Sequence, residues 1–515
     1  MGPPSVSVNP YQPSRRALET FNHGKAWDLM GQAGQRPAYD PKSRPDGLIN
    51  LSGAVNILMR DWLEEYTDQA MREIQVSKTL SYGTISGGPK LCSTMASFFN
   101  RFFKPGCPVE PTQIVATNGV TAMIDLVTWT LCEPGDAVMY LAPTFYMLDY
   151  DLVSRNGIIG VPVSTTGLDK PFGGDDEDIR KLVGLLENAA DSTAANGSTP
   201  RMLFICNPSN PQGRCYSSQT LAALVRFCAS RHMHLVADEI YALSHFGDEP
   251  FCSVLSVVDD QDTNVDGKQM IHGIYGLSKD FDMGGVRMGF LITRNTAFAE
   301  AIKRVTWFTW ITAFSEVFVT NFFSRLDLVH DYVSTYQERI SAAYSKTREA
   351  LIKYDIPFEP ATSGLFVFVN LGRWIRYFDG PNQADADATP ETQLCNWLLD
   401  GGVFLNPGQF AFCDRPGHFR LVFTEVPIET VVLSIERIRV SLDKLDMGME
   451  ICQQRVALED ENCDTRSDDQ TTLCVSESSK KNTYISMGVV PVTMPIGRKE
   501  PSILRVIWQK LSCMS

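Results

Sequence analysis

The sequence has few of the features that mark secreted, metal-binding or nucleic-acid-binding proteins. Its 13 cysteines include no Cys-x-x-Cys pair. An odd, scattered set of this kind is typical of reduced thiols and predicts neither a disulfide framework nor a zinc site. The formal net charge is -14, so no excess of basic residues is available to bind nucleic acid or an anionic membrane. We therefore expect no metal, nucleic acid or membrane among its ligands and partners.

Long apolar runs and targeting segments are also missing. The first residues lack the basic and then apolar pattern of a secretory signal, and Val6 occupies a position at which a myristoylation motif requires Ser or Thr. The most apolar stretch, residues 307–323, is interrupted by polar residues such as Glu316 and Asn321. A membrane span needs about 20 largely apolar residues. These absences predict a soluble protein of the cytoplasm.

The pattern that is present is an alternation of short apolar runs with helical stretches. With 515 residues, 44% of them hydrophobic, the chain can bury a large core and form more than one domain. The alternation is typical of βαβ units around a mostly parallel sheet. We expect strands at residues 113–117, 137–142, 202–206, 235–238, 270–276 and 289–293. The sequence therefore predicts an α/β fold with a large domain and a smaller α/β domain.

Composition and periodicity divide the chain into five parts. Residues 1–45 are rich in Pro, Gly, Arg and Gln and are expected to form an irregular N-terminal arm. The large domain is expected at 80–325, and the smaller one is expected to combine residues 46–79 with residues 326–446. Beyond that point the apolar periodicity fades, so residues 447–515 are predicted to form a disordered tail.

Lys279 lies in a loop of Ser, Gly and Asp residues directly after one expected strand, and Arg287 follows eight residues later. Small residues allow a bulky ligand to approach the lysine, and a fixed guanidinium can hold a phosphate. A covalent cofactor with an aldehyde and a phosphate needs both groups. Most lysines in loops are simply solvated, so this loop indicates a site only in the company of other motifs.

Other polar and aromatic motifs follow the expected strands in succession. A buried Asp238 can keep a heteroaromatic nitrogen protonated, and Tyr241, three residues later, can face the same pocket. Taken alone, each motif has an ordinary explanation as a helix cap, a turn or a core aromatic. Their succession along the chain is what indicates a ligand site. The further members are the helix start at Val120 and Thr121, the ring of Phe145, and the Asn-Pro turn that contains Asn210.

In this combination the sequence resembles the fold-type I pyridoxal-phosphate enzymes of the class I/II aminotransferase family. The motifs Ser278-Lys279-Asp280-Phe281 with Gly285-x-Arg287, and the Asn-Pro turn at 207–213, are most similar to the aminocyclopropane-carboxylate-synthase-like branch. The resemblance covers about residues 47–441. It implies a seven-stranded type of large sheet, pyridoxal 5'-phosphate as cofactor, and a homodimer with shared active sites.

The resemblance also implies a role for each motif residue. Lys279 is expected to bind the cofactor as a Schiff base and to move the substrate's α-proton, while Asp238 pairs with the pyridine nitrogen. Arg420 is expected to bind the substrate α-carboxylate by two hydrogen bonds. The remaining implied contacts are Tyr241 and Asn210 to the ring oxygen, with Asn210 also near the substrate, Phe145 stacked on the ring, Val120, Thr121 and Arg287 around the phosphate, and Tyr82 reaching the phosphate of the neighbouring subunit. Ser278, next to the lysine, is a further expected cofactor-binding residue.

Two positions depart from the family pattern. Gly276 replaces a phosphate-binding serine, and Val55 replaces a glutamate near the substrate. The missing acid argues against cyclopropane formation, so we expect an aminotransferase that acts on an L-amino acid and a 2-oxo acid. A lyase that breaks a C–S or other bond at the β or γ carbon would use the same residues and stays open. Aminocyclopropane-carboxylate synthase and a non-catalytic homologue are the less favoured alternatives.

Overall fold

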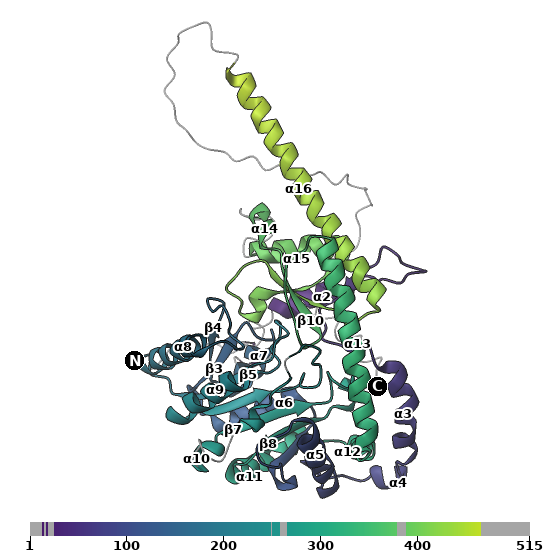
Figure 1. Ribbon diagram of the computed structural model, residues 1–515, viewed down its shortest axis with the longest axis vertical. Coiled ribbons are helices and arrows are strands. Elements are labelled where there is room, and N and C mark those ends of the chain that lie inside the picture. Colours follow the sequence, from purple (N-terminus) through teal and green to yellow (C-terminus); the bar gives the residue numbers. More distant parts are fainter. Residues whose placement is uncertain are drawn as a thin grey trace. The chain divides into compact units, whose positions relative to one another are not determined.

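The fold is known from a computed structural model that describes residues 13–14, 17–18, 25–248, 250–257, 265–378 and 388–464 (Figure 1). The chain separates into two units, Met1–Cys452 and Gln453–Ser515. The two sheets and the candidate site all belong to the first unit. Within the residues that are described, we find no helix whose length and apolarity would let it cross a bilayer.

A seven-stranded sheet forms the centre of the first unit (Figure 1). Its strands are β2 (Ile114–Thr117), β3 (Ala137–Ala142), β4 (Ile159–Ser164), β5 (Pro200–Cys206), β6 (His234–Asp238), β7 (Ile271–Gly276) and β8 (Gly289–Thr293). They lie in the order β2-β8-β7-β6-β5-β3-β4. Strand β8 runs antiparallel to β2 and β7, and the other neighbouring pairs are parallel. Every residue of β2, β3, β7 and β8 is buried, as continuous apolar strands between helical layers require. The predicted mostly parallel sheet is confirmed.

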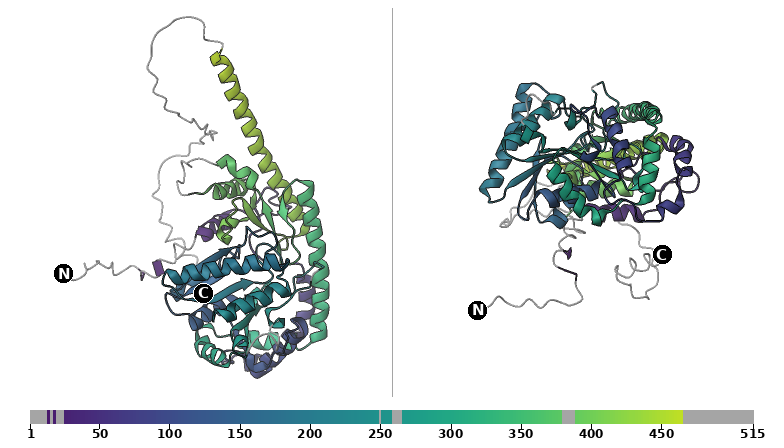
Figure 2. Two further views of the ribbon diagram at one scale, coloured as in Figure 1. Left: turned by 60° about the vertical axis from the view of Figure 1, so that its left-hand side comes forward. Right: turned by 90° about the horizontal axis from the view of Figure 1, so that it is seen from below.

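Helices cover this sheet (Figure 2). They are α5 (Pro89–Phe102), α6 (Val120–Leu131), α7 (Leu148–Asn156), α8 (Asp176–Ala195), α9 (Ser218–Ser230), α10 (Val265–Lys268), α11 (Thr296–Val305) and α12 (Ala313–Phe323). Helices α8 and α9 pack on each other and on β3 to β6, whereas α6 contacts α7, α11, β7 and β8. The side chains of Asp175 and Ser217 accept hydrogen bonds from the first backbone N–H groups of α8 and α9, which fixes where these helices begin.

A smaller antiparallel sheet carries the chain's later strands. It is ordered β12-β13-β10-β9, with β9 (Phe358–Glu359), β10 (Phe366–Asn370), β12 (Asn406–Pro407) and β13 (His418–Val422). A separate parallel pair joins β1 (Ile49–Asn50) to β11 (Val403–Phe404). This pairing brings the two chain segments of the predicted smaller domain into contact. The domain boundaries themselves stay a prediction.

The remaining helices belong to the chain segments before β2 and after β8. They are α2 (Lys25–Gln35), α3 (Arg60–Arg72), α4 (Val76–Thr79), α13 (Leu326–Lys353), α14 (Gly372–Ile375), α15 (Pro390–Asp400) and α16 (Ile428–Asp464). Helix α2 lies where we expected an irregular arm, because Ala26, Leu29 and Ala33 recur at helical spacing and are buried.

Helix α16 continues to Asp464, although we predicted disorder from residue 447. Residues 449–464 contain neither Gly nor Pro, and they include three Glu, two Gln and one each of Met, Arg, Ala and Leu. These residues favour helix even where the apolar periodicity has faded. The part of the predicted tail beyond residue 464 lies outside the described residues.

Candidate active site

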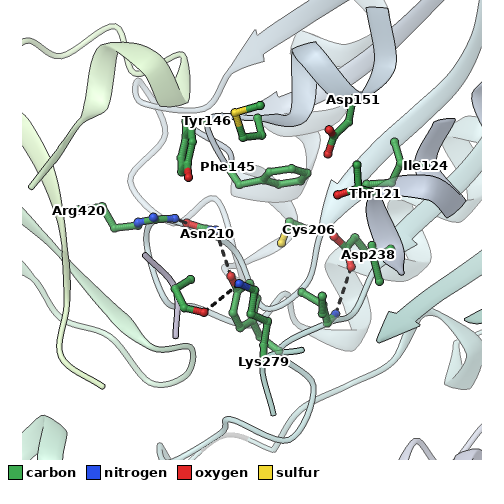
Figure 3. A pocket seen from close by; sticks show the side chains of 15 residues that line it. Thr121, Ile124, Phe145, Tyr146, Asp151, Cys206, Asn210, Asp238, Lys279 and Arg420 are labelled. Carbon is green, nitrogen blue, oxygen red and sulfur yellow. Dashed lines mark hydrogen bonds between the residues drawn. The ribbon is translucent and has the colours of Figure 1, made fainter. Parts of the chain in front are cut away.

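A pocket lies at the edge of the large sheet where its parallel strands end (Figure 3). Open α/β sheets bind ligands at this carboxyl edge because the loops after neighbouring strands converge there. The smaller sheet closes the pocket from the other side through Arg420 of β13. The lining residues are Ala54, Val120, Thr121, Ile124, Phe145, Tyr146, Met147, Asp151, Cys206, Asn210, Asp238, Ile240, Tyr241, Lys279 and Arg420.

Eight of the eleven predicted site residues line this pocket together. These are Val120, Thr121, Phe145, Asn210, Asp238, Tyr241, Lys279 and Arg420. Ser278, Arg287 and Tyr82 are not among the lining residues. The Tyr82 side chain is 92% exposed and stacks on Trp310, with ring centroids 5.3 Å apart. The cofactor contacts of Ser278 and Tyr82 therefore stay predictions.

Lys279 is partly buried, lines the pocket and is held at two points. Its Nζ donates a hydrogen bond to the Ala54 carbonyl at 2.8 Å, and its own carbonyl accepts one from Asn56 Nδ2 at 3.1 Å. Burial lowers the pKa of the amine to about 8, with the positive charge of Arg420 as the next cause. An amine in this range is partly neutral near pH 7 and can act as nucleophile and base.

Asp238 is the last residue of β6 and is almost fully buried. Its Oδ1 accepts a hydrogen bond from the Ile240 N–H at 3.2 Å. Burial raises the pKa of this carboxyl to about 7, opposed by that hydrogen bond and by Lys279. A carboxylate in so apolar a setting is stabilised by a cation beside it. Asp238 thus suits a protonated ring nitrogen bound in the pocket.

Arg420 connects the smaller sheet to the Asn-Pro turn of the large one. Its Nη1 donates to Asn210 Oδ1 at 3.1 Å, and its Nη2 donates to the Ser52 carbonyl. Asn210 Nδ2 in turn donates to the Tyr241 hydroxyl at 3.4 Å. The Arg420 Nε is buried and has no hydrogen-bond partner. A guanidinium with a free buried donor beside a pocket suits a ligand carboxylate.

The opposite end of the pocket has the features of a phosphate site. Val120 and Thr121 begin helix α6, whose first backbone N–H groups and dipole favour an anion. Gly119 precedes them with φ at +121°, and a Cβ at that position would lie 2.5 Å from Arg287 Nη2. The guanidinium of Arg287 therefore packs directly against the start of α6, although its side chain does not line the pocket.

The structure explains why Gly276 can replace a serine. A Cβ built on Gly276 would lie 2.5 Å from Val120 Cγ2 and 3.3 Å from the Met288 carbonyl. The Val120 side chain thus fills the space that a serine would need. The two positions form one packing unit, and the hydroxyl contact is exchanged for an apolar one.

We expect Gly276→Ser alone to lower the free energy of unfolding by about 1–3 kcal/mol, because it overpacks a filled site. The double variant Gly276→Ser/Val120→Ala frees that space and is expected to recover most of the loss. Chemical denaturation of the three proteins would check this. If the single variant were as stable as the parent protein, the packing account of Gly276 would be wrong.

Sequence reasoning missed several lining residues, of which Asp151 is the most polar. It lies in α7 on the same buried face as Leu148 and Leu152, so its helical spacing was the available signal. Burial raises the pKa of Asp151 to about 8, with Asp238 the next cause. The pocket therefore contains a second carboxyl group, whose ionisation is disfavoured by burial and by the charge of Asp238.

Comparison with known proteins gives the family. Residues 48–438 match the family described as aminotransferase class I and II. The chain is 28% identical over 420 residues to 1-aminocyclopropane-1-carboxylate synthase 6 of Oryza sativa subsp. japonica, covering 79% of this chain and 74% of that protein. It is 30% identical over 411 residues to a Mus musculus protein named "Probable inactive 1-aminocyclopropane-1-carboxylate synthase-like protein 2", covering 78% and 67%.

A solved structure of kynurenine aminotransferase from Pyrococcus horikoshii has the same fold, with a TM-score of 0.65 and 18% identity over 84% of this chain and 97% of that one. The family match spans most of the chain. The chain therefore belongs to the class I and II aminotransferase family, and its fold is that of the fold-type I pyridoxal-phosphate enzymes.

The cofactor of this family is pyridoxal 5'-phosphate, and the pocket fits it. Lys279 offers an amine of lowered pKa for the aldehyde, and Asp238 offers a buried carboxylate for the ring nitrogen. Phe145 lines the pocket, and its flat ring suits stacking on the cofactor ring. The start of α6 with Arg287 suits the phosphate. When bound, the cofactor supplies an electron-accepting ring that stabilises negative charge at the substrate Cα.

Proposed function

We propose that the protein transfers the amino group of an L-amino acid to a 2-oxo acid, with Lys279 as the residue that moves the proton. The observation that carries the proposal is the shared contact of two basic groups with residues 52–54. Lys279 Nζ donates to the Ala54 carbonyl, and Arg420 donates to the Ser52 carbonyl. A substrate carboxylate bound by Arg420 would therefore bring its Cα near the lysine amine.

The ionisable groups of the pocket meet the requirements of transamination. Transfer requires a single base that takes a proton from Cα and returns it to a neighbouring atom. Lys279 is the only amine among the lining residues of this pocket. The two carboxylic acids in the lining, Asp151 and Asp238, have pKa values raised by burial. One mobile base is sufficient for transamination, in which the proton removed from Cα is returned to a neighbouring atom.

Ring formation and a non-catalytic role are two alternatives whose support comes from the names of the relatives. The names of the relatives include a cyclopropane-carboxylate synthase and a protein called probably inactive. We rank ring formation lower because position 55 is valine. We rank a non-catalytic role lower because lysine, aspartate and arginine share one pocket. A lyase remains the second hypothesis for the enzymatic activity, because elimination begins with the same proton abstraction.

The proposal is tested by adding single L-amino acids to the holoenzyme and recording its absorbance. We expect conversion of the cofactor to its pyridoxamine form, and reversal when a 2-oxo acid is added. Release of ammonia and a 2-oxo acid without pyridoxamine would assign a lyase. A cyclopropane amino acid as product would assign a synthase. Failure of every amino acid to change the spectrum would overturn the enzyme proposal.

We also propose that two copies of the chain form a homodimer with shared sites. The support is a group of exposed apolar side chains, since such patches mark contact surfaces. Tyr82 and Phe308 are 92% and 84% exposed. The ring centroid of Trp310 lies 5.3 Å from that of Tyr82 and 5.2 Å from that of Trp307. Sedimentation of the holoenzyme at twice the mass of one chain is expected, and a monomer would contradict the proposal.

A further inference from the structure

Glu425 places a carboxylate beside the candidate site, although the sequence lacks an acid at position 55. The residue follows β13, the strand that carries Arg420. Its neighbour Thr424 is joined to the opposite segment twice, through Thr424 Oγ1 to the Val55 carbonyl at 2.6 Å and through the Ile57 N–H to the Thr424 carbonyl at 2.9 Å. These bonds hold residues 424–425 against residues 53–57.

The carboxylate itself rests on Gly53. A Cβ built on Gly53 would lie 2.7 Å from Glu425 Oε1, so any larger residue there would displace the carboxylate from this position. The backbone of Gly53 acts to lower the pKa of this carboxyl, which places its N–H on the side of the carboxylate. The other oxygen, Oε2, is buried and has no hydrogen-bond partner. A buried acceptor without a donor is costly, and this one lies next to the pocket.

The position relates Glu425 to both basic groups of the site. The residues on either side of Gly53 are Ser52 and Ala54, whose carbonyls accept hydrogen bonds from Arg420 and Lys279. Burial raises the pKa of the Glu425 carboxyl to about 7, and the backbone of Gly53 and the positive charges of Arg420 and Lys279 act against this rise. A substrate bound between Arg420 and Lys279 would therefore bring its side chain or carboxylate close to Glu425.

We propose that Glu425 is a specificity-determining residue of the substrate site, which favours amino acids whose side chains donate hydrogen bonds and disfavours those with a second carboxylate. The proposal rests on the proposed function, since it assumes that Arg420 holds the α-carboxylate. A donor such as a side-chain amide would satisfy Oε2. A second carboxylate would meet a like charge at low dielectric, which is unfavourable.

The test compares L-glutamine with L-glutamate, which differ only in amide against carboxylate. In the parent protein we expect a higher kcat/KM and tighter binding for glutamine. Glu425→Gln keeps an oxygen that can accept from the Gly53 N–H but removes the charge. We expect it to shift the glutamine-to-glutamate ratio by about tenfold toward glutamate. Gly53→Ala should weaken the discrimination in the same direction, because its Cβ displaces the carboxylate.

Binding to the holoenzyme, measured by titration calorimetry, separates this inference from the proposed function. Discrimination in binding that disappears in Glu425→Gln, without any transamination, would support the inference and contradict the function. An unchanged glutamine-to-glutamate ratio in Glu425→Gln would overturn the inference and assign Glu425 a structural contact with Gly53. If Glu425→Gln failed to fold, an unchanged ratio in Gly53→Ala would overturn it equally.

Discussion

Replacing Lys279 with alanine is expected to lower turnover by a factor of about 10⁴ or more, because one side chain serves both as covalent anchor and as proton carrier. The pocket lining contains no second amine. The covalent linkage between protein and cofactor should disappear with it. Steady-state turnover and the absorbance of the linked cofactor measure the two losses independently.

The result would not reflect misfolding. Burial lowers the pKa of the Lys279 amine to about 8, which means that the charged amine is unfavourable in the folded protein. Its removal should leave the stability of the protein without cofactor unchanged or improved. Lys181→Ala is a matched control, since this lysine lies on the exposed side of α8, where it forms an ion pair with Glu177. A Lys279→Ala protein that kept both its linked cofactor and its turnover would refute the assignment.

Much of the fold could be predicted from the sequence because its central strands are buried on both faces. Each of the six expected strands coincides with an observed one, and the runs at 137–142 and 289–293 match β3 and β8 residue for residue. Strand β4 was missed. It lies at the edge of the sheet, contains Gly160 and Pro162, and is mostly not buried. A half-exposed edge strand has no continuous apolar run by which it can be recognised.

The site residues that could be predicted from the sequence differ in the same way from those that could not. Residues that directly follow a strand, such as Lys279 and Asp238, are located by the strand itself and could be named in advance. Asp151 depends on the rotation of α7, and Glu425 depends on how residues 424–425 pair with residues 53–57. Contacts between segments so distant in sequence are set by tertiary packing, which local patterns do not encode. The pKa of Lys279 likewise depends on burial, which only the folded chain defines.

Asp238→Asn is expected to lower kcat by about 10²–10⁴-fold while the cofactor remains bound. The change removes a negative charge from a buried position and keeps nearly the same shape. An amide oxygen can still accept the hydrogen bond from the Ile240 N–H. What is lost is the charge that keeps a ring nitrogen protonated, and with it the electron-accepting strength of the ring. Turnover with the preferred amino acid measures this loss, and Asp68→Asn, on the exposed face of α3, is the control.

Stability provides a second and independent measurement on the protein without cofactor. Burial raises the pKa of Asp238 from 3.8 to about 7. An acid with a raised folded-state pKa costs stability as the pH rises from the unfolded value to the folded one, since the unfolded chain releases its proton first. Asp238→Asn should remove this cost, so its free energy of unfolding should fall less between about pH 4 and 7 than that of the parent protein. A variant with unchanged kcat and the parent's pH dependence would show that Asp238 neither pairs with the ring nor bears the cost of burial.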